Sequence, residues 1–91
     1  MADIISGVSE TKLKKFEDER GAVMHMLRKD DPHFEKFGEV YFSWTKRGIV
    51  KAWKLHQRAT LNFAVPCGNI KVVLYDNRVS SRTFGVVNEF F

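Results

Sequence analysis

Lys54 and His56, two residues apart in the segment Gly48–Gly68, are side chains of types that move protons. The segment alternates, which predicts a strand that carries both side chains on the same face as Val50 and Ala52. An imidazole exchanges protons near neutral pH, whereas an amine acts as a base only where burial or a nearby cation lowers its pKa. A polar pair beside small apolar residues suits the inside of a ligand-lined barrel better than a packed core.

The elements that must position this pair read as short strands between turns. The expected strands are Ile4–Val8, Gly21–Arg28, Glu39–Trp44, Gly48–His56, Leu61–Val65, Ile70–Tyr75 and Thr83–Phe91. Thr11–Phe16 is either another strand or a loose turn, and turns are expected at Asp18–Gly21 and Thr45–Gly48. Asp30, Asp31 and Pro32 form a helix-start signal, which predicts one short helix over His33–Phe37. Strands of this length with short turns predict an all-β sandwich or barrel.

Composition narrows the class of protein. A chain of 91 residues with 44% hydrophobic residues is long enough for one domain and too apolar for disorder. The net charge of +4 is scattered, and Lys12, Lys14 and Lys15 form the one tight basic cluster. We therefore expect a solvated face or mild attraction to phosphorylated ligands, and no nucleic-acid partner. The single Cys67 excludes an intramolecular disulfide and a multi-cysteine zinc site.

The two ends of the sequence indicate where the protein is located and how it associates. The first ten residues show no signal-peptide pattern, and no apolar run approaches the length of a membrane span. We expect a cytoplasmic protein with no membrane partner. The sequence ends on an apolar strand with Phe90 and Phe91, which predicts pairing of that edge with another chain.

Several blocks of residues, in this order and spacing, closely resemble the dTDP-4-dehydrorhamnose 3,5-epimerase family. The blocks are Asp18–Gly21, Phe37–Ser43, Gly48–Trp53, Asn62–Val65, Val73–Arg78 and Ser81–Gly85. Members of that family are cupins, which are double-stranded β-helix barrels that dimerise through exchanged strands. The resemblance therefore implies a partial cupin-like jelly-roll barrel of about seven strands with one short helix, assembled as a homo-oligomer, most simply a dimer by strand exchange.

The resemblance covers only the first part of such a protein. Family members continue past the equivalent of Phe91 with a second half that supplies a catalytic Tyr. We expect residues 1–91 to form a single truncated cupin-like domain, either a cut fragment or a naturally short relative. An independent small β-fold is the other interpretation.

The resemblance also assigns roles to the proton-moving pair. In the family, the first His of a pair removes a proton next to the sugar ketone and a Lys steadies the enolate oxygen. Lys54 stands at the base position and His56 two residues along, so these two are the catalytic candidates. The metal-binding cupin pattern keeps only His56, with Leu61 at the acidic position, so we expect no metal and no other cofactor.

The remaining candidates are contacts to a nucleotide-sugar ligand. Arg20 and Arg78 match arginines of the family pattern, and Lys51 stands where an Arg is usual. Arg20 and Arg78 would contact phosphate oxygens, and ion pairs with Asp18 and Asp76 are the alternative. Trp53 would stack on a base or sugar, and core packing is the alternative.

Three functions remain open at this point. The first is a cupin that resembles nucleotide-sugar epimerases and binds a sugar nucleotide with weak or no catalysis. The second is an active epimerase or ketoisomerase acting on a dTDP-4-keto-6-deoxy sugar through His56 and Lys54. The third is a structural or interaction protein that has lost its pocket.

Overall fold

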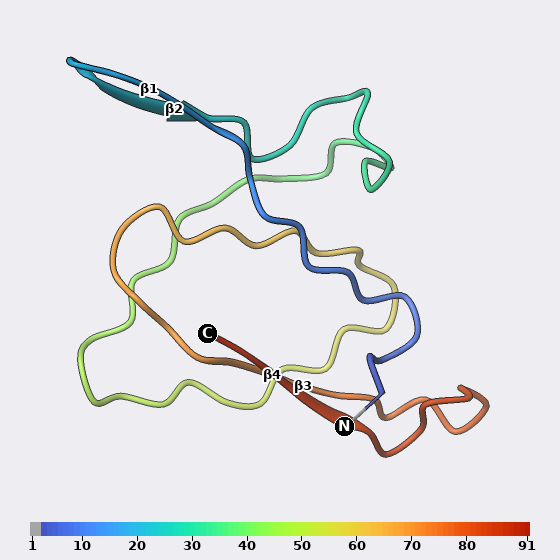
Figure 1. The fold of residues 1–91 in the computed structure, drawn as a ribbon. Coiled ribbons are helices and arrows are strands. Elements are labelled where there is room, and N and C mark those ends of the chain that lie inside the picture. The colour runs from blue at the N-terminus through green and yellow to red at the C-terminus, as the bar shows by residue number, and fades with distance from the viewer. Residues whose placement is uncertain (1–2) are drawn as a thin grey trace. The chain divides into compact units, whose positions relative to one another are not determined.

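The computed structural model describes residues 3–91, and all of its regular structure is β (Figure 1). Strands β1 (Lys15–Asp18) and β2 (Gly21–Met24) form one antiparallel sheet, and β3 (Val72–Tyr75) and β4 (Val87–Phe90) form another. The chain divides into two units, which we call the terminal unit (Met1–Met24 with Ala64–Phe91) and the middle unit (His25–Phe63). Both sheets lie in the terminal unit. The all-β class agrees with the sequence.

The β1–β2 hairpin turns through Glu19 and Arg20. Asp18 pairs with Gly21 across the ladder, and the turn forms where the sequence predicts it. Gly21 has a φ of +149°, a conformation that residues with a Cβ rarely adopt. The glycine therefore lets β2 begin directly after two turn residues.

The β3–β4 hairpin is more buried than the β1–β2 hairpin. Val72, Val73 and Leu74 of β3 are half-buried, as expected of branched side chains on a pleated surface. Val72 pairs with Phe90 and Tyr75 with Val87. The eleven residues between the strands fold into turns, including a hydrogen bond of 2.8 Å from the Gly85 amide to the Asp76 carbonyl.

The core of the described chain is small and mostly polar. Ile5 is its buried apolar residue, and the other buried residues are Asp76, Thr83 and Asn88. All four belong to the terminal unit, where residues 3–8 meet the β3–β4 hairpin. The buried side-chain polar atoms of the described residues all have hydrogen-bond partners.

The predicted helix over His33–Phe37 is wrong. The described residues contain no helix, and two turns follow one another at this place. The amide of Asp31 donates to the Arg28 carbonyl at 2.9 Å, and the amide of Phe34 donates to the Asp31 carbonyl at 3.0 Å. The Asp31 carboxylate also accepts from the Arg28 amide at 2.6 Å. Five residues between Pro32 and Gly38 are too few to repay helix nucleation, so the cap residue stabilises a turn instead.

The middle unit contains none of the strands expected over Glu39–Trp44, Gly48–His56 and Leu61–Val65. The turn before Gly48 does form, with the Ile49 amide 3.1 Å from the Lys46 carbonyl. An extended segment becomes a strand only when a neighbour supplies hydrogen-bond partners, and no ladder forms among residues 25–63. The structure thus has four strands in place of about seven, and the cupin barrel stays a prediction.

Candidate functional site

Arg20 lies at the tip of the β1–β2 hairpin. Its amide donates to Asp18 Oδ1 at 2.8 Å, and its Nη2 donates to Asp18 Oδ2 at 3.0 Å. These bonds, the side-chain bond foremost, lower the pKa of Asp18. The ion pair weighed as an alternative is thus formed. The Arg20 side chain is nevertheless 85% exposed, so much of its guanidinium faces solvent above a shallow hollow lined by Phe16, Gly21 and Val23.

Arg78 is held much more tightly. Its Nε donates to Asp76 Oδ1 at 2.8 Å and its Nη2 to Asp76 Oδ2 at 3.0 Å, which makes a bidentate pair. The Asp76 side chain is fully buried, and that of Arg78 is 57% exposed. The alternative of an ion pair with Asp76 is therefore realised at this position too.

Asp76 collects donors from the whole β3–β4 turn. Its Oδ2 accepts from the hydroxyls of Ser81 and Thr83, each at 2.6 Å, and its Oδ1 accepts from the Arg78 amide at 3.1 Å. The bond with Arg78 is the main cause that places the pKa of Asp76 far below its usual value, and the two hydroxyls add to it. The same pair raises the pKa of Arg78. Asp76 is therefore ionised at neutral pH and serves as the hub of this turn.

The other four candidates belong to the middle unit. Lys51 donates from Nζ to Ser43 Oγ at 3.1 Å and also to the Trp44 carbonyl. Trp53 is 68% exposed, so the alternative of core packing is not realised in this chain. Lys54 and His56 are exposed in an extended segment without regular strand structure. Their catalytic roles stay predictions.

The predicted residues thus divide between the two units. Within the terminal unit, Arg20 joins Asp18 and Arg78 joins Asp76; Lys51, Trp53, Lys54 and His56 follow one another in the middle unit. Sequence reasoning placed Asp76, Ser81 and Thr83 inside motif blocks, and it considered Asp76 as a partner of Arg78 but gave Ser81 and Thr83 no role. A signal was present, because the eight positions from Asp76 to Thr83 hold four hydroxyl or carboxylate residues and two arginines.

Asn88 was missed altogether. It is a buried carboxamide within β4, and its Oδ1 accepts from the Ile5 amide at 2.8 Å. The signal was an amide that follows Val86 and Val87 and is separated from the phenylalanines by Glu89 alone, which predicts a satisfied partner if this face of the strand is buried.

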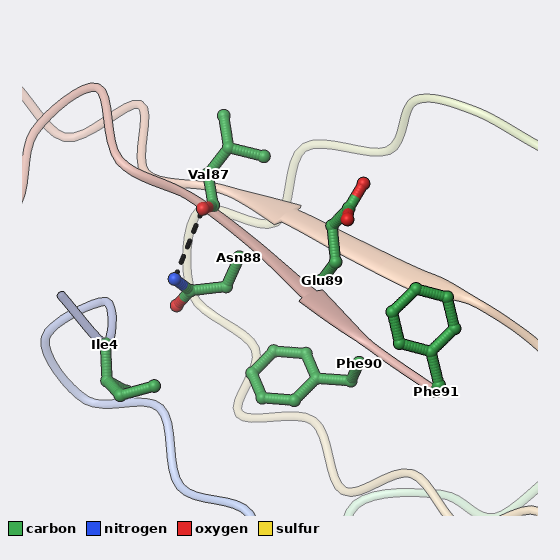
Figure 2. A pocket seen from close by; sticks show the side chains of 6 residues that line it. All are labelled: Ile4, Val87, Asn88, Glu89, Phe90 and Phe91. Carbon is green, nitrogen blue, oxygen red and sulfur yellow. Dashed lines mark hydrogen bonds between the residues drawn. The ribbon is translucent and has the colours of Figure 1, made fainter. Parts of the chain in front are cut away.

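A shallow hollow beside β4 completes the description of the terminal unit. It encloses about 400 Å³ and is lined by Ile4 and by Val87–Phe91. Figure 2 shows Ile4 on one side and the Phe91 ring on the other, with the Phe90 ring between them and the Asn88 amide, bonded to the Val87 carbonyl, above Ile4 and Phe90. Its lining is mainly apolar.

Two features of residues 3–91 concern metal binding and membrane insertion. No group of three or more His, Cys, Asp or Glu side chains is arranged to hold a metal ion there. Nor is any helix of that part long and apolar enough to cross a membrane.

Two curated proteins are similar in sequence to this chain. One is the spore coat polysaccharide biosynthesis protein SpsL of Bacillus subtilis, 34% identical over 88 residues, which covers 97% of this chain and 58% of that protein. The other is the probable low-salt glycan biosynthesis epimerase Agl13 of Haloferax volcanii, 36% identical over 75 residues, which covers 80% of this chain and 48% of that protein. The chain spans about half the length of these relatives. No protein-family model matches the chain, and no solved structure matches it either.

The relatives support the coarser half of the motif-based resemblance. Both are named for polysaccharide or glycan biosynthesis, and one is named an epimerase. They support a relationship to epimerase-like proteins of sugar biosynthesis. They do not single out the dTDP-4-dehydrorhamnose 3,5-epimerases.

Proposed function

We propose that this chain binds a sugar nucleotide, with weak or no catalysis of its own. The observation that carries the proposal is the 34% identity to SpsL along 97% of the chain, because it extends the sugar-biosynthesis similarity to nearly every residue. The epimerase name of Agl13 supports the same substrate class. The altered base position, Lys54, is the reason for proposing reduced catalysis.

Arg20 is the proposed contact to the diphosphate. Its side chain is largely exposed, and its planar guanidinium carries more N–H donors than Asp18 occupies. A phosphate oxygen can therefore be bound without breaking the bond to Asp18. Lys51, Trp53 and Arg78 are proposed as further ligand contacts, with Lys51 and Trp53 exposed in the middle unit.

A thermal-shift series tests this binding. Sugar nucleotides with dTDP or UDP should raise the melting temperature of the full chain, because a ligand that binds only the folded state stabilises it. Arg20→Ala should abolish that rise and leave the ligand-free melting temperature almost unchanged, since the pair with Asp18 is exposed. The matched control is Arg47→Ala, which removes another exposed turn arginine and should keep the full rise. Equal rises in the Arg20→Ala and parent proteins would reject the phosphate contact.

An active epimerase is the second candidate, and the name of Agl13 favours it. In that case, His56 and Lys54 would remove and return the proton next to the ketone of a 4-keto-6-deoxy sugar nucleotide. Incubation in D₂O distinguishes the two proposals. Deuterium appearing in the sugar, and lost in His56→Gln, would establish catalysis; binding without deuterium incorporation would leave the binding protein.

We also propose that the chain works as a homo-oligomer. The support is the apolar surface it exposes: Phe42 and Trp44 are each 81% exposed and Val50 is 86% exposed. Exposed apolar surface of this extent is typical of an interface. If neither sugar nucleotides nor their products bind, this surface favours the third candidate, an interaction protein that has lost its pocket.

A further inference from the structure

Residues 3–8 contact the β3–β4 hairpin in an unusual way. We call them the strap. Side chains of the hairpin bind the backbone of the strap. Asn88 contacts the peptide groups of Asp3 and Ile5. Thr83 and Arg78 contact those of Ser6. These contacts join residues more than seventy positions apart.

The Asn88 carboxamide takes the place of a peptide group in a β-ladder. Its Oδ1 accepts from the Ile5 amide at 2.8 Å, and its Nδ2 donates to the Asp3 carbonyl at 2.9 Å. A neighbouring strand would offer the same pair of groups to residues two apart on an extended chain. One buried side chain thus satisfies two strap groups in the manner of a missing strand.

Ser6 is held by a second pair of bonds. Its amide donates to Thr83 Oγ1 at 2.9 Å, and its carbonyl accepts from Arg78 Nη2 at 2.7 Å. Thr83 and Arg78 are in turn both bonded to the Asp76 carboxylate. The Asp76 hub therefore orients the two groups that grip the middle of the strap.

We propose that this face of the hairpin is a docking site for a short backbone segment, occupied in this chain by the strap, in which the Val8 amide closes a turn on the Ile5 carbonyl at 3.0 Å. Recognition is of peptide groups, so it depends on Asn88 and Thr83 and is independent of the strap's own polar side chains. Docking buries Ile5 and also places Ile4 as one wall of the hollow beside β4 (Figure 2). Release of the strap would therefore open that hollow. This proposal goes beyond the function proposed above and shares only Arg78 with it.

Amide hydrogen exchange on the full chain, followed by NMR, tests the proposal. Asn88→Leu keeps the size of the side chain and removes both of its polar groups. The Ile5 and Ser6 amides should then exchange about tenfold faster, the scale expected when two modest hydrogen bonds are lost. Asn69→Leu, which makes the same change at an exposed site of the same unit, should leave their exchange unchanged. Unchanged Ile5 and Ser6 exchange in Asn88→Leu would overturn the proposal.

A second set of variants decides the matter if Asn88→Leu loosens the whole hairpin. Thr83→Ser keeps the hydroxyl and should preserve the protection of the Ser6 amide from exchange. Thr83→Val removes the hydroxyl and should reduce that protection. Ser6→Ala changes only a side chain of the strap and should leave protection intact. Loss of protection in Ser6→Ala, or equal protection in the two Thr83 variants, would show that the strap is not held through its backbone.

Discussion

Asp76 and Asp18 have the same local hydrogen-bonding arrangement, but their different burial gives them different importance for stability. Each carboxylate accepts from the amide and the guanidinium of the Arg two positions later. Asp18 is 47% exposed at a hairpin tip, whereas Asp76 is fully buried and also bound by Ser81 and Thr83. A buried carboxylate must keep every partner, while an exposed one exchanges its partner for water.

Replacing each Asp by Asn therefore has unequal effects. Asp76→Asn should lower the melting temperature by at least about 5 °C, because an amide set against two hydroxyls and a guanidinium cannot accept all their bonds. Asp18→Asn, the matched control, should lower it by about 1 °C or less. Thermal unfolding followed by circular dichroism gives both values, and equal shifts would contradict the hub role of Asp76.

The lowered pKa of Asp76 also sets a pH dependence. The pKa of Asp76 in the folded chain lies below its ordinary value of 3.8, so the contribution of Asp76 to stability is present above that value. It is lost progressively as the pH falls below about 4, where the unfolded state binds the proton first. The melting temperature of the parent protein should thus fall more steeply than that of Asp76→Asn between about pH 5 and pH 2. Parallel curves would contradict the assignment.

At the level of elements, the sequence predicted those hairpins whose partners are near in sequence or whose turn is clear. The Asp18–Gly21 turn and the core of the Ile70–Tyr75 and Thr83–Phe91 strands are all found, shortened at their ends. The segments over Glu39–Trp44 and Gly48–His56 have strand-like patterns without a ladder. Their residue patterns indicate that they could fit into a sheet. A strand also needs a neighbouring strand to hydrogen-bond with, and the local sequence does not determine whether one is present.

The candidate site was predictable to a similar extent. The ion pairs of Arg20 and Arg78 follow from an Asp two positions earlier, a local signal. The hydrogen bond between Asn88 and Ile5 joins residues 83 positions apart, and no feature of the residue spacing predicts it. The apolar partners that would enclose Lys54 and His56 are likewise not set by alternation alone.

Gly85 tests whether the turn before β4 depends on backbone conformation. Its φ is +84°, and an added Cβ would meet no atom within 4 Å. Gly85→Ala should therefore cost about 1–2 kcal/mol in the free energy of unfolding through backbone strain alone. Gly38→Ala, where φ is not positive and space is also open, should be neutral or slightly stabilising. Urea unfolding measures the free energy of unfolding of both variants. If Gly85→Ala changed it as little as Gly38→Ala, the proposed backbone strain would be contradicted.

At the scale of the whole molecule, exposed surface is the dominant feature. Large apolar side chains are exposed in both units, among them Trp44 and Trp53 of the middle unit and Phe91 of the terminal unit. Surface of this kind is stable in water when another chain covers it.

Self-association should therefore be measurable. Sedimentation velocity of the full chain should show a dimer or larger species, since apolar area of this extent favours a partner copy. Phe90 and Phe91 border the hollow beside β4, and changing both to Ser should shift the sedimenting species toward the monomer. Changing Val79, which is 84% exposed in the β3–β4 turn, to Ser is the control and should leave the species unchanged. A monomer in the parent protein would contradict the assembly.

The most direct test of the proposed function is a calorimetric titration of sugar nucleotides into the full chain. The account predicts saturable binding of at least one dTDP- or UDP-linked sugar, weakened about tenfold or more by Arg20→Ala as expected for loss of a charged hydrogen bond. If Arg20→Ala bound the sugar nucleotide as tightly as the parent protein, the ligand site would not lie at the β1–β2 hairpin. No heat of binding from any sugar nucleotide would contradict the account itself.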